Sequence, residues 1–87
     1  MSVAVLFFAS LREQVGREQI SLPADEVPDL PSLLARLDRE LGDVASHLHR
    51  PSVRVALNQS LLDTDDAARR SLKDGDEVAF LPPITGG

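Results

Sequence analysis

The 87-residue sequence predicts an α+β fold, a mixed sheet with one main helix packed on one face. Two observations lead there: one stripe of leucines has helical spacing, and short β-branched runs stand on both sides of it. A chain of this length buries about 60–65% of its unfolded surface, which suffices for one hydrophobic core. One helix on one face of a sheet is the layered arrangement that so small a chain can complete.

The first strand is predicted over Val3 to Ala9, a run of β-branched and aromatic residues. It is apolar at both parities, so both of its faces should be covered. Residues Ser10 to Gly16 are predicted to form a turn that the glycine ends. Glu18 to Leu22 alternates between polar and apolar residues, as in an edge strand with one wet face, and should pair with the first strand as a hairpin.

The clearest helix is predicted after three prolines, with its apolar stripe at Leu30, Leu33, Leu34, Leu37 and Leu41. This spacing places all five leucines on one side of a helix. Asp29 can accept hydrogen bonds from the first turn, and Pro31 is tolerated within that turn. Gly42 can supply the left-handed residue that ends the helix.

The second half of the chain predicts a third strand at 53–57, a turn at 58–59, a short return strand at 60–62, a capped helical turn or loop at 63–73, a tight turn at 74–76 and a last strand at 77–81. Pro82 and Pro83 stop the last strand. The order of elements favours a β-grasp arrangement. The first and last strands should lie side by side at its centre, because both are apolar at both parities. Residues 1–81 would form this domain, and residues 82–87 an extended tail that ends in Gly-Gly.

Strand parity also predicts an apolar outer face. Val3, Val5, Phe7 and the strand residues that share their face are expected to pack on the helix. The residues that alternate with them are then left outside: Ala4, Leu6, Phe8, Ala56, Leu61, Ala79 and Leu81. A contiguous exposed apolar patch marks a protein interface more often than chance. We therefore expect a docking surface for a partner on this face.

Composition excludes several classes of function. The net charge of -5 and the pI near 4.8 argue against a nucleic-acid partner, which requires a basic face. No apolar run approaches the roughly 20 residues of a membrane span, and no signal peptide is recognisable, so we expect no membrane partner and a cytoplasmic location. The chain has no cysteine, so any sulfur that it carries must sit elsewhere than on a side-chain thiol.

No metal site is predicted. His47 and His49 are two residues apart, a poor spacing for one helix face, and we assign them no role. Asp63, Asp65 and Asp66 superficially resemble a calcium loop, but the glycine and the distal glutamate are not at the required positions.

The segment Asp74 to Gly87, together with Val5 to Ala9, Leu11 to Glu13 and Leu57 to Gln59, resembles the small-subunit family of molybdopterin synthase, MoaD, within the MoaD/ThiS sulfur carriers. The resemblance spans the whole chain. It implies a ubiquitin-like β-grasp fold. It also implies that Gly87 is adenylated with ATP by a MoeB-like adenylyltransferase, thiocarboxylated with sulfur from a sulfurtransferase, and then used to supply sulfur.

The resemblance further implies that the acceptor is cyclic pyranopterin monophosphate, which becomes the dithiolene of molybdopterin in molybdenum cofactor biosynthesis. The chain would be the sulfur-donor subunit of the enzyme. The main catalytic residues are expected on a separate MoaE-like large subunit, in a heterotetramer of two small subunits at the ends of a large-subunit dimer. No cofactor would be permanently bound, since ATP is used by the activating enzyme.

The catalytic group by this resemblance is the carboxylate of Gly87, carried on the tail residues Pro82, Pro83, Ile84, Thr85 and Gly86. Glycine lacks a Cβ and can pass close to the walls of a narrow channel, whereas proline fixes φ and directs the chain. Six residues can reach on the order of 20 Å.

The resemblance implies that three apolar residues, Phe8, Leu61 and Leu81, lie where the large subunit docks, and we predict them as anchors. Leu6 is predicted as a further residue of this interface. Arg12 is a further candidate for a partner contact, and so is Lys73. For both, a simple solvated side chain is the competing interpretation.

Two other functions compete. One is a sulfur carrier for thiamine or for another pathway. The other is an interaction module or protein modifier, in which Gly87 is joined to a lysine of a target, because ubiquitin-like folds serve both purposes.

Overall fold

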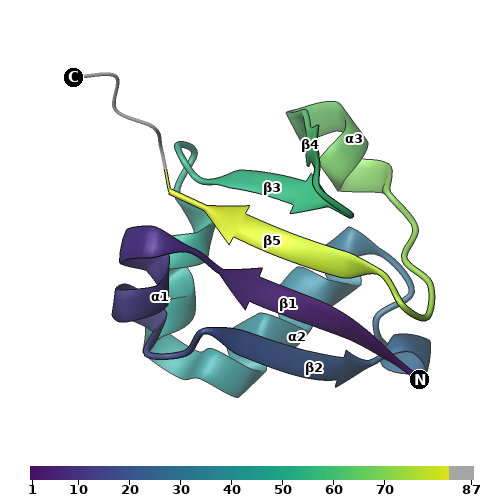
Figure 1. Cartoon of the computed structure of the whole chain (residues 1–87), viewed down its shortest axis with the longest axis horizontal. Helices are drawn as coiled ribbons and strands as arrows, with labels where there is room; N and C mark the ends of the chain where they lie inside the picture. Colours follow the sequence, from purple (N-terminus) through teal and green to yellow (C-terminus); the bar gives the residue numbers. More distant parts are fainter. Residues whose placement is uncertain (83–87) are drawn as a thin grey trace.

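The computed structural model describes residues 1–82, and its centre is a five-stranded sheet in the order β2-β1-β5-β3-β4 (Figure 1). The strands are β1 Ser2–Phe7, β2 Gln19–Pro23, β3 Arg54–Leu57, β4 Ser60–Leu62 and β5 Glu77–Leu81. The helices are α1 Ala9–Val15, α2 Leu30–Leu41 and α3 Thr64–Arg69, with the 3-10 segments η1 Ala24–Glu26 and η2 Gly42–His49. None of the helices within residues 1–82 has the length and apolarity that spanning a membrane requires.

Among the strands of residues 1–82, only the central pair of β1 and β5 is parallel. Strand β2 lies antiparallel to β1, and β3 lies antiparallel to both β5 and β4. Strands β2 and β4 are therefore the edges, and α2 crosses behind the sheet in Figure 1. This topology confirms the predicted β-grasp arrangement, with its first and last strands side by side at the centre.

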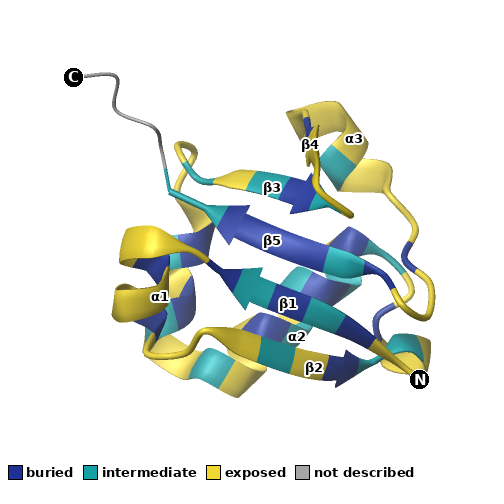
Figure 2. Ribbon diagram, in the orientation of Figure 1, coloured by how far each residue is buried: buried dark blue, intermediate teal, exposed yellow. Residues whose placement is uncertain are grey.

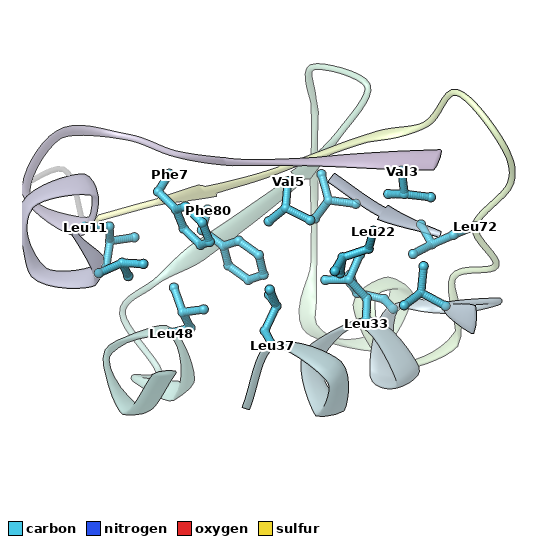
Figure 3. Packing of buried hydrophobic residues seen from close by; sticks show 14 of the residues in the cluster. Val3, Val5, Phe7, Leu11, Leu22, Leu33, Leu37, Leu48, Leu72 and Phe80 are labelled. Atoms are coloured by element: carbon cyan, nitrogen blue, oxygen red, sulfur yellow. The ribbon is translucent and has the colours of Figure 1, made fainter. Parts of the chain in front are cut away.

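The core lies between the sheet and the helices. Val3, Val5, Phe7, Val78 and Phe80 are at most 1% exposed. Figure 3 shows side chains of the sheet pointing towards leucines that include Leu33, Leu37 and Leu48. The rings of Phe7 and Phe80 stack with centroids 5.8 Å apart and an interplanar angle of 17°. Such an aromatic pair contributes about 0.5–1.5 kcal/mol beyond the area that it buries.

Helix α2 begins and ends where the sequence predicts. The Asp29 carboxylate accepts a hydrogen bond from the Ser32 N–H at 2.8 Å, and Gly42 follows the helix with φ of 66°. Hydrogen bonds from the Ser32 hydroxyl and then from its N–H lower the pKa of Asp29, because they favour the charged carboxylate. Leu30, Leu33 and Leu37 are buried on the face towards the sheet.

The turn predicted over residues 10–16 is wrong, since this segment forms helix α1. Leu11 and Val15 are one helical turn apart, and both are buried on the same side. Ala9 has φ of 51°, so the chain leaves strand geometry there, and β1 ends at Phe7 rather than at Ala9. The predicted stop at Gly16 is confirmed, with φ of 81°.

The β3–β4 turn and the segment after β4 form as the sequence predicts, and a 3-10 segment that was not predicted precedes β3. Asn58 and Gln59 have φ of 50° and 72°, the left-handed geometry of a two-residue hairpin turn. The predicted capped turn after β4 is helix α3, where Asp63 accepts from the Asp66 N–H at 2.8 Å. Between α2 and β3 the chain forms the 3-10 segment η2, which packs Ala45 and Leu48 into the interior.

We predict that Asp29→Asn removes a pH-dependent part of the stability. The pKa of Asp29 is lowered in the folded chain. The charged carboxylate therefore contributes fully above the unfolded pKa of about 4, and this contribution is lost as pH falls through the lower folded value. Urea unfolding of wild type and of Asp29→Asn should show that the difference between their free energies of unfolding narrows as the pH falls from about 6 to about 2.

The matched control is Asp25→Asn, which changes an exposed carboxylate in η1 that caps no helix in the described chain. A difference between wild type and Asp29→Asn that stays constant across this pH range would contradict the prediction.

Candidate functional site

The face of the sheet opposite α2 carries an apolar row that crosses four strands. Leu6 pairs with Ala79, Ala79 with Ala56, and Ala56 with Leu61, from β1 through β5 and β3 to β4. Side chains at directly paired positions lie on the same face of a sheet. Figure 1 views the sheet from this side, which we call the open face.

Of the large apolar side chains of the open face, Phe8 and Leu61 are exposed, and Leu6 and Leu81 are half-buried. Leu61 is 58% exposed and Phe8 45%, whereas Ala56 and Ala79 are 6% and 8% exposed (Figure 2). Both alanines lie outside the core cluster, so their burial comes from their neighbours in the sheet. The predicted apolar outer face is therefore confirmed. In its row, the two buried alanines lie between Leu6 and the exposed Leu61.

A second row lies at the carboxyl end of β5. Leu81 pairs with Arg54 of β3, and the Phe8 N–H donates to the Phe80 carbonyl at 3.2 Å, which places Phe8 beside the end of the same strand. Pro82 follows directly and is half-buried. The base of the predicted tail is thus part of the open face.

The other tail residues, Pro83, Ile84, Thr85, Gly86 and the catalytic candidate Gly87, lie outside the described residues. The tail and the role of its terminal carboxylate remain predictions.

The two cationic candidates lie far apart. Arg12 is on the exposed side of α1, whose Leu11 and Val15 are buried. Lys73 is exposed in the loop before β5, and its N–H donates to an Asp76 carboxylate oxygen at 2.9 Å. Arg12 therefore belongs to the helix that follows β1, whereas Lys73 lies where β5 begins. A role for either in partner binding remains a prediction.

His49 and Asp63 have structural partners, whereas the buried Nδ1 of His47 has no hydrogen-bond partner among the described residues. The His49 ring pairs with the Asp38 carboxylate at 2.6 Å, and Asp63 caps α3. Within residues 1–82, no three side chains of His, Cys, Asp or Glu come together in a way that could hold a metal ion.

Sequence reasoning missed Arg54 as a site residue. It is an exposed cation at the edge of an apolar face, directly opposite Leu81. Arg54 lies two residues before Ala56, so the alternation of side chains along the strand indicates that both lie on the open face. Only the strand register shows that Arg54 also lies opposite Leu81, beside the base of the tail.

Sequence reasoning also missed the buried carboxylate of Asp76, which is 5% exposed. One of its oxygens accepts from the Asn58 side-chain amide at 3.0 Å, and the other accepts from the Lys73 N–H. The Asn58 amide oxygen in turn accepts from the Glu77 N–H at 2.9 Å. Asp76 therefore ties the β3–β4 turn to the start of β5, and so helps to position Leu61 on the open face.

We predict that Asp76→Ala lowers the free energy of unfolding by about 2 kcal/mol, because two donors lose their acceptor in a buried place. Asp74→Ala is the matched control, since the exposed Asp74 carboxylate accepts one hydrogen bond, from the Ser2 N–H. Urea unfolding should show a clearly smaller loss for the control. Equal losses for the two variants would contradict the role given to Asp76.

Known proteins resemble this chain over almost its whole length. The model of the ThiS family matches residues 5–87. A protein of Escherichia coli named molybdopterin synthase sulfur carrier subunit is 39% identical over 85 residues, which cover 98% of this chain and 99% of that protein. Small archaeal modifier protein 3 of Haloferax volcanii is 32% identical over 92 residues, with 100% of both chains covered.

A solved structure is also similar. The protein–protein complex of subunits 1 and 2 of the molybdopterin-converting factor from Helicobacter pylori contains a chain that is 30% identical to this one. The TM-score is 0.71, and the match covers 100% of both chains.

Proposed function

Because the chain belongs to the ThiS family, we propose that it is the sulfur-carrier small subunit of a molybdopterin synthase. One observation carries the mechanism: the base of the tail and the open face form one surface, where Leu81 lies opposite Arg54 and close to Phe8. A partner that covers this surface therefore also receives the chain that follows Pro82. The name of the Escherichia coli relative supports the choice of pathway.

The chemistry begins at the Gly87 carboxylate. A carboxylate is a poor acyl electrophile, and its adenylation with ATP by a MoeB-like enzyme supplies AMP as a good leaving group. A sulfur nucleophile delivered by a sulfurtransferase then displaces AMP, and the terminus becomes a thiocarboxylate. The carrier thereby holds a sulfur nucleophile although it has no cysteine.

The acceptor in this proposal is cyclic pyranopterin monophosphate, which becomes the dithiolene of molybdopterin. The carrier supplies sulfur, and a MoaE-like large subunit supplies the main catalytic residues, in a heterotetramer. ATP is used by the activating enzyme, and the carrier itself holds no permanent cofactor. The Helicobacter pylori complex, which pairs two subunits of one converting factor, supports a large-subunit partner.

We predict that Leu61→Asp and Phe8→Asp each weaken binding to the large subunit by at least about thirtyfold, roughly 2 kcal/mol. Each variant places a charge where docking would remove water from an exposed apolar side chain. Ala35→Asp is the control, because Ala35 is exposed on α2, behind the sheet. Isothermal titration calorimetry with the purified large subunit measures all three. Unchanged affinity for both open-face variants would rule out this docking surface.

We also predict that Gly87 gains one sulfur in place of one oxygen. Intact-mass spectrometry after incubation with ATP, the activating enzyme and a sulfur donor should show this exchange, and fragmentation should assign it to the last residue. The control is the chain without Gly87, in which the tail is shorter by one residue. Absence of the exchange from the full chain, while the enzyme still adenylates a known carrier, would overturn the proposal.

A protein modifier is the second candidate function, and the name of the Haloferax volcanii relative favours it. It differs in the acceptor of the acyl group, which would be a target lysine rather than sulfur. Isopeptide-linked adducts of Gly87 in cells would support the modifier. Loss of molybdoenzyme activity on deletion of Gly87 would support the sulfur carrier. Co-purification with a thiazole synthase would instead point to the thiamine branch.

A further inference from the structure

The cations of this chain are almost all arginines. Of its nine Lys and Arg residues, only Lys73 is a lysine. A lysine amine attacks activated acyl groups when it is unprotonated, whereas a guanidinium keeps its proton and is not a nucleophile. A chain whose terminus is activated as an acyl group is therefore exposed to attack from a single side-chain amine of its own.

Lys73 and Pro82, at which the tail begins, lie at opposite ends of the sheet. Its N–H is bonded to Asp76, directly before β5, whereas the tail follows Pro82 at the other end of that strand. Asp76 and Pro82 are six positions apart along an extended strand, which at about 3.3 Å per position separates them by about 20 Å. In Figure 1, the loop before β5 lies at the right, near the N-terminus, and β5 ends at the left.

Position 54 lies at the base of the tail and carries an arginine. Arg54 is paired with Leu81, and the Cα atoms of directly paired antiparallel residues are about 4.5–5.5 Å apart. The five residues after Pro82 span at most about 18 Å. A side chain at position 54 is thus well within reach of Gly87, whereas Lys73 is reached only by a tail stretched back along the sheet.

We propose that this arrangement determines the chemical specificity of the carrier. The cation near the tail is an arginine, which is not a nucleophile, and the single lysine lies at the far end of the sheet. The activated Gly87 is thereby protected from attack by its own chain. The proposal rests on the proposed activation of Gly87. The effective concentration of an amine falls steeply when a linker can barely span the distance, so Lys73 competes poorly with an external sulfur nucleophile.

The avoided reaction is an internal aminolysis. The lysine nitrogen would attack the Gly87 carbonyl carbon, a C–N bond would form, and the C–O bond to AMP would break. AMP would leave with the electron pair, and the amine proton would pass to solvent. The product is a cyclic amide that lacks one water relative to the free chain, and its terminus can no longer accept sulfur.

The test uses the whole chain with a thioester at Gly87, made by intein cleavage with a small thiol. This thioester stands in for the acyl-adenylate and needs no activating enzyme, so a failure of enzymatic activation does not affect the result. The variants are Arg54→Lys and, as the matched control, Arg70→Lys, since Arg70 lines the same groove as Lys73. Intact mass and tryptic mapping measure the rate and the position of cyclisation.

We expect Arg54→Lys to cyclise at position 54 at least about tenfold faster than wild type or Arg70→Lys under native conditions. In guanidinium chloride, wild type should cyclise at Lys73, because the two residues are close in the sequence and the sheet no longer separates them. Circular dichroism checks that Arg54→Lys is folded. Arg12→Lys, at an exposed position of α1, replaces it if it is not.

Native wild type that cyclises as fast as the lysine variant at the tail base would overturn the proposal. A rate for that variant no higher than that of Arg70→Lys would also overturn it. So would a denatured wild type that cyclises no faster than the native chain, because the fold would then give no protection.

Discussion

The parallel pairing of β1 with β5 holds together both the core and the candidate site. Val5 lies opposite Val78 and Phe7 opposite Phe80, all four are buried, and the two rings stack. Since the strands are parallel, their carboxyl ends meet at the same end of the sheet. The turn into α1, with Phe8, therefore lies beside the residue at which the tail begins. The loop that carries Lys73 lies at the other end.

The two faces of this central pair are apolar for different reasons. The inner face is filled by large side chains that pack on α2 and η2. The outer face has small alanines at its centre, with Phe8 and Leu61 exposed around them, and no helix within residues 1–82 covers it (Figure 2). The hydrogen bonds of Asp76 and Asn58 join the β3–β4 turn to the start of β5, and so help to hold Leu61 beside the rest of the outer face. An apolar face beside a strand end suits a carrier that must present its terminus to a partner.

Sequence reasoning succeeded where one local pattern decides the structure. Helix α2 follows from its leucine stripe and its Asp29 cap, and β5 follows from an apolar run between a glycine turn and two prolines. It failed for α1, because a seven-residue helix offers only Leu11 and Val15 as a periodic signal, and the left-handed Ala9 leaves no mark in the sequence.

The candidate site was predictable in its apolar part and not in its polar part. Parity alone assigned Phe8 and Leu61 to the outer face. The positions of Arg54 and Asp76 depend on strand register and on hydrogen bonds between segments far apart in the chain. The chemistry proposed for Gly87 came from the resemblance of the terminal segment to a known family, because strand parity and helical spacing say nothing about a terminus.

Titration of a methyl-labelled chain with the large subunit, followed by NMR, would show whether the open face and the tail base are one partner surface. If they are, the methyl signals of Leu6, Leu61 and Leu81 should shift or broaden first, while those of Leu33 and Leu37 on α2 stay in place. Perturbation confined to the α2 side, with the open-face methyls unchanged at saturation, would contradict a single surface for docking and tail delivery.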